Sequence, residues 1–95
     1  MDYNLVLKAR AENELSDAIS WYESQLRGLG LAFLNTIETY LNGIQQNPYQ
    51  YPLRKIPYRE AVVRKFPYII IYEVVDNEVV VYSIFHTHRN PKNKT

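Results

Sequence analysis

Residues Tyr68–Val75 and Glu78–Phe85 read YIIIYEVV and EVVVYSIF, and only Asp76-Asn77 lies between them. Valine, isoleucine and tyrosine are enriched in β-strands, and a two-residue link of this kind is typical of a tight hairpin. The dense β-branched residues of Ile69–Ile71 and Val79–Val81 indicate strands that are buried on both faces. This stretch therefore predicts an antiparallel hairpin at the centre of a sheet.

The flanking sequence extends this sheet. A strand from about Glu60 to Phe66 is predicted just before the hairpin, and Tyr3–Lys8 has the short, imperfect alternation of a first strand. The first strand must then pair with one of the others across the intervening chain. Residues 48–58 contain three of the five prolines and three tyrosines, so we expect an ordered loop pinned to the body by its aromatic side chains.

Between residues 10 and 47 the apolar spacing becomes helical. Helices are predicted at residues 10–27 and 31–47, with Gly28 and Gly30 ending the first and Asn47-Pro48 ending the second. The short glycine-containing link makes them an antiparallel hairpin. Their apolar stripes are Ala11, Leu15, Ala18, Ile19, Tyr22 and Leu26 in the first helix, and Leu31, Leu34, Ile37, Leu41 and Ile44 in the second.

The predicted fold class is therefore α+β, with the order β-α-α-β-β-β. We expect a four-stranded antiparallel sheet with the helical hairpin on one face, and a single domain over residues 1–95.

Composition indicates a cytoplasmic protein. The chain has no cysteine, which excludes disulfides, thiol catalysis and thiolate metal sites. Its first residues lack the basic segment and apolar run of a signal peptide, and its longest apolar runs are too short to span a membrane.

Charge is divided unevenly along the chain. Residues 1–47 carry three bases and six acids, a net charge of −3, whereas residues 48–95 carry eight bases and four acids, a net charge of +4; the sum is the overall +1. A basic C-terminal half is compatible with a nucleic acid or an acidic protein partner, and equally with an ordinary solvated surface.

No known catalytic motif accounts for the polar residues. The three glycines do not have the spacing of a phosphate-binding loop. His86 and His88 lack a third histidine or cysteine to complete a zinc site, so no metal or cofactor is expected. His86 could be a general acid near arginines in phosphodiester cleavage, or a hydrogen-bonded residue that ends its strand.

The nine tyrosines invite two interpretations, base stacking or core packing. Tyr22, Tyr40, Tyr72 and Tyr82 lie within apolar patterns and are assigned to the core. Tyr49, Tyr51 and Tyr58, in the proline-rich segment, stay ambiguous.

Three motifs in order resemble those of the RelE/ParE superfamily of toxins. Residues 11–23 (AENELSDAISWYE) are similar to its opening helix, and residues 64–74 (RKFPYIIIYEV) resemble its KFPY-x-I-x-Y strand. His86-Thr87-His88-Arg89-Asn90-Pro91 is similar to its closing H-x-x-R-x-P motif. The resemblance extends from Leu7 to Pro91 and leans to the ParE-like, plasmid-stabilisation branch.

The resemblance implies the toxin of a type II toxin–antitoxin pair, which forms a hetero-oligomer with a cognate antitoxin and causes growth arrest. The ParE branch inhibits DNA gyrase by binding, whereas the RelE branch cleaves mRNA on the ribosome. The apolar Ile69–Ile71 and the lack of Tyr, Phe or Trp after Phe85 favour the ParE branch. A nuclease and an inactive or repurposed interaction domain are the alternatives.

The same resemblance suggests which residues act. On the binding interpretation, the contact surface consists of Arg59, Arg64, Lys65, His86 and Arg89. On the nuclease interpretation, Arg64 and Arg89 hold the phosphate while His86 or His88 acts as the acid. Arg64 and Arg89 are expected to share one edge of the sheet.

Overall fold

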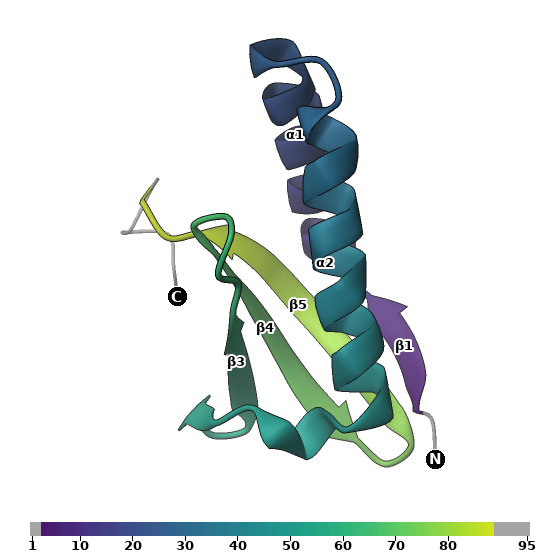
Figure 1. The fold of residues 1–95 in the computed structure, drawn as a ribbon. Helices are drawn as coiled ribbons and strands as arrows, with labels where there is room; N and C mark the ends of the chain where they lie inside the picture. Colours follow the sequence, from purple (N-terminus) through teal and green to yellow (C-terminus); the bar gives the residue numbers. More distant parts are fainter. Residues whose placement is uncertain (1–2, 89–95) are drawn as a thin grey trace.

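A helical hairpin packs on one face of a five-stranded sheet in the computed structural model, which describes residues 3–88 (Figure 1). The hairpin extends past the end of the sheet (Figure 1). The elements are β1 (Asn4–Leu7), α1 (Ala9–Gln25), α2 (Leu29–Gln46), the 3-10 turn η1 (Pro48–Gln50), β2 (Leu53–Lys55), β3 (Tyr58–Val62), β4 (Tyr68–Val75) and β5 (Glu78–His86).

The observed sheet differs from the expected one in the number of its strands and in the direction of one of them. Its order is β1-β5-β4-β3-β2, and β1 runs parallel to β5, with Asn4 opposite Glu78 and Leu7 opposite Val81. The expectation of four antiparallel strands was therefore wrong. Parallel strands need a connection that leaves the sheet, and the chain between β1 and β5, which includes the helical hairpin, supplies it.

The additional strand is β2, inside the segment expected to be a loop. Leu53 pairs with Arg59 and Lys55 with Tyr58, and all three residues of β2 are exposed. Pro52 and Pro57 flank it. Proline is tolerated at the border of a short edge strand, because the outer N–H groups there need no partner.

The central hairpin has the predicted form. β4 and β5 pair antiparallel from Tyr68 opposite His86 to Val75 opposite Glu78, and Asp76 takes a φ of 53° in the turn. Both strands lie inside the sheet, and β5 is buried along most of its length. The register slips by one residue beside Tyr72, which makes a β-bulge near Tyr82.

The helices form where they were predicted, with corrections near their junction. Leu26 and Leu31, expected in the apolar stripes, are exposed, whereas Phe33, outside the expected stripe, is fully buried. Gly28 takes a left-handed φ of 88° and begins α2, so Gly30 lies inside the first turn of α2 and does not end α1. An added Cβ at Gly30 would lie 2.7 Å from the Ile19 carbonyl oxygen, so only glycine allows α1 and α2 to approach this closely.

The core lies between the hairpin and the sheet. Ala11, Ala18 and Tyr22 of α1 and Phe33, Ile37, Leu41 and Ile44 of α2 pack there against the apolar residues of β3, β4 and β5. Neither helix within residues 3–88 is long and apolar enough to cross a membrane.

Candidate functional site

The turn between β3 and β4 presents two exposed cations. Arg64 and Lys65 both lie on the surface, and the Arg64 backbone N–H donates to the Tyr40 hydroxyl at 3.1 Å. The same turn is tied to the end of β5, because Pro67 O accepts the Thr87 N–H at 2.7 Å. The turn that carries Arg64 and Lys65 therefore adjoins the end of β5, where His86 lies, and we call these three residues the sheet-end surface.

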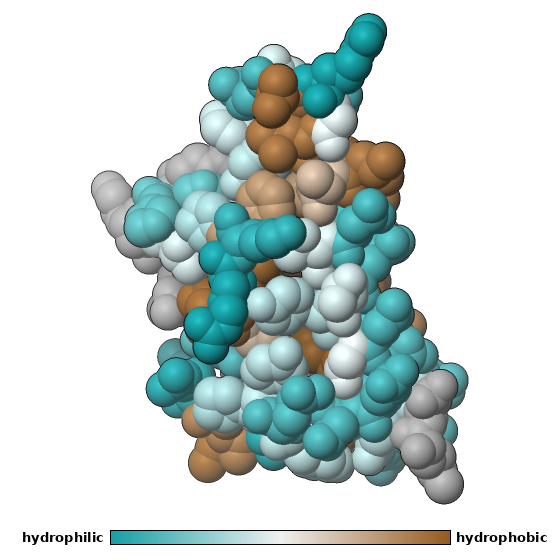
Figure 2. Space-filling model, in the orientation of Figure 1, coloured by the Kyte–Doolittle hydropathy of each residue, from teal (hydrophilic) through white to brown (hydrophobic). Residues whose placement is uncertain are grey.

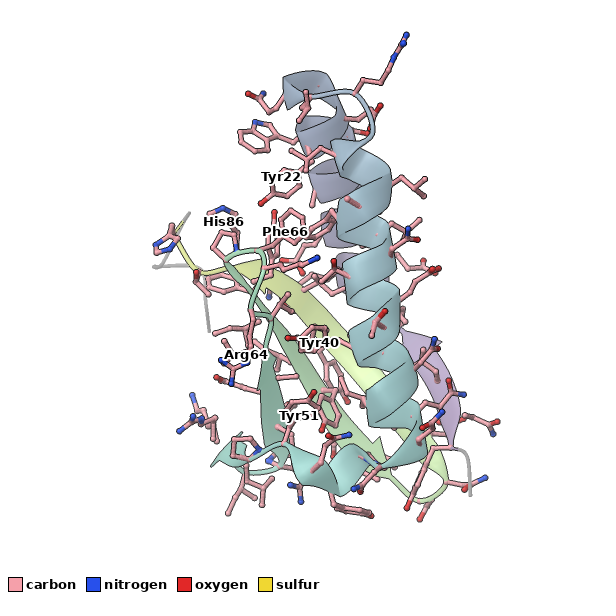
Figure 3. The ribbon with its side chains drawn as sticks, viewed as in Figure 1. Tyr22, Tyr40, Tyr51, Arg64, Phe66 and His86 are labelled. Carbon is pink, nitrogen blue, oxygen red and sulfur yellow. The ribbon has the colours of Figure 1, made fainter. Side chains whose placement is uncertain are left out.

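An aromatic cluster holds this turn against the helices. The Phe66 ring lies edge-on to Tyr22 and Phe33, with centroids 5.0 Å away in each case. Tyr68 packs on Phe33 at 4.9 Å and on His86 at 5.0 Å. Figure 3 shows Tyr22, Phe66 and His86 converging where the hairpin meets the sheet. The Phe-Pro-Tyr motif is thus a packing motif that positions the cations beside it.

His86 and His88 form a local pair. The His88 backbone N–H donates to His86 Nδ1 at 3.0 Å, and the two rings lie 6.0 Å apart. His86 is half-buried and His88 is exposed. In residues 3–88, no three His, Cys, Asp or Glu side chains gather as a metal site would require. Arg89 lies outside the described residues, so its expected proximity to Arg64 has no structural account.

Arg59 lies away from the sheet-end surface. It is opposite Tyr72 in the sheet, whereas Val62, nearest the turn, is opposite Ile69. Its Nη1 donates to the Tyr51 carbonyl oxygen at 2.7 Å, and its guanidinium lies 5.0 Å from the centroid of the Tyr49 ring. These contacts pin η1 and the chain after it to the sheet.

The tyrosines divide by burial. Tyr22 and Tyr72 are buried as expected, and Tyr40 and Tyr82 are half-buried. Burial raises the pKa of Tyr72 to about 12, and its hydroxyl donates to the Pro48 carbonyl oxygen. The pKa of Tyr82 is also raised, because its hydroxyl donates to Glu73 at 2.8 Å.

Two further surfaces escaped the sequence analysis. Trp21, Leu26 and Leu31 are exposed at the far end of the helical hairpin, where apolar surface gathers in Figure 2. A pocket of about 500 Å³ is lined by Lys8, Arg10, Lys55, Tyr58, Glu60, Ile71, Tyr82 and Ser83. These residues come from four strands and a helix start, so no local motif could have revealed the pocket.

The comparisons with known proteins agree with this architecture. The model of the family described as "ParE toxin of type II toxin-antitoxin system, parDE" matches residues 5–91. The sequence matches no curated protein. A chain of the chromosomal ParDE toxin–antitoxin system of P. aeruginosa is similar in structure, with a TM-score of 0.80, 17% identity, and coverage of 90% of this chain and 97% of that one.

Two other solved structures share the fold. A double mutant of the E. coli toxin RelE in the free state has a TM-score of 0.68 and 22% identity, over 96% of this chain and 90% of that one. The RelBE2 toxin–antitoxin complex of Mycobacterium tuberculosis contains a chain with a TM-score of 0.61 and 18% identity, over 90% of this chain and 99% of that one.

Proposed function

Because this chain belongs to the family of ParE toxins of type II toxin–antitoxin systems, we propose that it inhibits DNA gyrase by binding and is neutralised by a cognate antitoxin. The match over residues 5–91 carries this proposal. Structural neighbours that are toxin–antitoxin assemblies support the antitoxin as a partner. Growth arrest and a role in plasmid stabilisation are the expected cellular consequences.

The sheet-end surface is the proposed contact with the target. Arg64 and Lys65 are exposed there, while the rings of Phe66 and Tyr68 hold their turn in place. The planar guanidinium of an arginine can make paired hydrogen bonds to a carboxylate or phosphate and loses less side-chain entropy per bond than a lysine does. Arg89, outside the described residues, is proposed as part of the same contact from its motif.

Arg59 enters the proposal in a different role. Its guanidinium is already bonded to the Tyr51 carbonyl oxygen and lies over Tyr49. We expect it to support the contact indirectly, by fixing the segment that precedes β2.

A second candidate is ribosome-dependent cleavage of mRNA. The observation that favours it is the His86 imidazole beside the turn that carries Arg64 and Lys65, an arrangement suited to a general acid next to a bound phosphate. The fold is shared with RelE but does not decide between the two chemistries, because one fold hosts several functions.

One comparison tests both candidates. The purified chain is added to a gyrase supercoiling reaction and, in parallel, to ribosomes that hold an mRNA. We expect supercoiling to stop while the mRNA stays intact. Cleaved mRNA with normal supercoiling would establish the nuclease instead. No effect in either reaction, together with harmless expression in cells, would indicate a repurposed interaction domain and reject the toxin function.

A further inference from the structure

The pocket of about 500 Å³ lies on the face of the sheet opposite the helices. Side chains alternate along a strand, so neighbours in sequence point to opposite faces. Leu7, Ala61, Ile70 and Val81 pack in the core under the helices, and their neighbours Lys8, Glu60, Ile71 and Tyr82 line the pocket. Figure 1 shows both helices packed on the core face of the sheet.

The floor of the pocket is apolar and aromatic. Ile71 lies at the centre of the sheet, and the Tyr58 and Tyr82 rings meet edge to face, with centroids 5.4 Å apart and planes at 87°. An apolar side chain placed against this floor would be removed from water on several sides.

The rim of the pocket is cationic. Lys8, Arg10 and Lys55 line it against one carboxylate, Glu60, which gives the lining a net charge of +2. Lys8 and Arg10 are two of the three bases in residues 1–47, the half of the chain with a net charge of −3. Folding therefore brings these two cations to the same pocket as Lys55, and Arg10 keeps its neighbour in sequence, Glu14, as an ion-pair partner.

The nearby carboxylates already have partners. Glu14 accepts the Ser83 hydroxyl at 2.7 Å and the Ile84 N–H at 2.9 Å, and it pairs with Arg10 at 3.2 Å. Glu73 accepts the Tyr82 hydroxyl. Both carboxylates are therefore held beside β5 by these bonds.

We propose that this pocket docks an acidic segment of the cognate antitoxin, with one apolar side chain on the Ile71 floor and flanking carboxylates at Lys8 and Lys55, while Arg10 stays paired with Glu14. The inference rests on the proposed function, which supplies the antitoxin. An interface with an apolar centre and a charged rim has the anatomy of specific protein complexes. The rim cations steer and orient the segment, and the floor supplies the buried area.

A peptide fits this pocket better than a nucleic acid. The two tyrosine rings are packed against each other, so they do not form parallel platforms for successive bases. Glu60 lies in the lining and Glu73 next to Tyr82, and both carboxylates would repel a continuous phosphate backbone. A peptide can place its few carboxylates at the cations and leave the acidic positions free.

Charge reversal of the rim tests the proposal. The antitoxin, taken from the neighbouring reading frame, is titrated into the full-length chain by calorimetry. The variants are Lys8→Glu, Lys55→Glu and the matched control Arg27→Glu, an exposed residue at the hairpin end with the same charge change. We expect Kd to rise about tenfold or more for each rim variant, because like charges face each other across the interface, and to stay within about twofold for the control.

Thermal melts show which variants are folded, and the milder Lys8→Gln and Lys55→Gln replace any that is not. Wild-type affinity in the folded rim variants would overturn the pocket assignment. Loss of binding to a labelled single-stranded RNA in the rim variants, with the antitoxin affinity unchanged, would also overturn it in favour of a nucleic acid. A wild-type chain that neither binds the antitoxin nor arrests growth would instead reject the proposed function itself.

Discussion

The Glu23 carboxylate on α1 accepts the backbone N–H of Gly30, in the first turn of α2, at 3.0 Å. It also accepts the Gly28 N–H at 3.0 Å. The first N–H groups of a helix have no partner within the helix, and a carboxylate there also suits the positive end of the helix dipole. A side chain of one helix thus caps the start of the next, and the glycine makes room for it.

Gly30→Ala tests this close approach. The new methyl group would meet the Ile19 carbonyl oxygen at 2.7 Å and the Glu23 Cβ at 3.0 Å, so the helices must separate. We expect the free energy of unfolding to fall by about 1–3 kcal/mol in urea titrations. Gly43→Ala is the control, because its Cβ would meet only Gln50 Nε2 at 3.9 Å. It should raise stability by roughly 0.5–1 kcal/mol through helix propensity. Equal effects of the two substitutions would contradict this account.

Glu14→Ala removes the acceptor for two groups of β5. The Ser83 hydroxyl and the Ile84 N–H would lose their bonds at a nearly inaccessible point of the sheet. Leaving such groups unpaired costs about 1–3 kcal/mol, to be measured by thermal or urea unfolding. Asp17→Ala, on an exposed position of the same helix, is the control and should change stability little. An unchanged midpoint for Glu14→Ala would show that water replaces the carboxylate.

Tyr72 makes stability fall at alkaline pH. Its pKa is about 12 in the folded chain against about 10 in the unfolded one, because burial disfavours the phenolate. Between pH 10 and 12 the unfolded chain loses this proton and the folded chain keeps it, so unfolding becomes easier by roughly 3 kcal/mol. At pH 7 Tyr72→Phe should have a lower free energy of unfolding than the wild type, because the hydrogen bond to the Pro48 carbonyl oxygen is lost. Between pH 10 and 12 its free energy of unfolding should not show the loss that comes from ionisation of Tyr72. Parallel stability curves for the two proteins over that range would rule out Tyr72 as the cause.

Arg59 and Arg64 should separate stability from toxicity. Arg59→Leu loses the bond to the Tyr51 carbonyl oxygen and the contact with Tyr49, so its melting temperature should fall by several degrees. Arg64→Glu should keep its melting temperature, because the bond to the Tyr40 hydroxyl comes from the Arg64 backbone N–H, which the substitution retains. The same variant should lose growth arrest. Full toxicity of folded Arg64→Glu would remove Arg64 from the contact surface.

Arg89 and His88 give a second comparison, based on the sequence motif for Arg89. Arg89→Lys should abolish growth arrest with little loss of stability, because lysine cannot reproduce a paired contact to a phosphate or carboxylate. His88→Ala should keep both, because His88 is exposed and contributes a backbone N–H to His86. Toxicity retained by Arg89→Lys, or lost only through unfolding, would end the functional assignment of Arg89.

Local sequence determined the two helices and the central hairpin of this protein. The apolar residues from Ala11 to Tyr22 are spaced so that they share one buried face only in a helix. The two β-branched runs on either side of Asp76-Asn77 pair with each other as the predicted hairpin. The opening helix, the Phe-Pro-Tyr motif and the His-x-x-Arg motif, taken in order, identified the superfamily that the family match confirms.

Tertiary structure alone decided how distant segments meet. The parallel pairing of β1 with β5 joins residues more than seventy positions apart, and no periodicity within either strand encodes it. The short edge strand β2 depends on β3 for its hydrogen bonds, so its own proline-flanked sequence predicted a loop. Arg59 and Lys8 show the same limit for the sites. In the sequence each of them is simply a basic residue. The folded sheet places Arg59 where it bonds the Tyr51 carbonyl oxygen, and it places Lys8 beside Lys55 in the lining of the pocket.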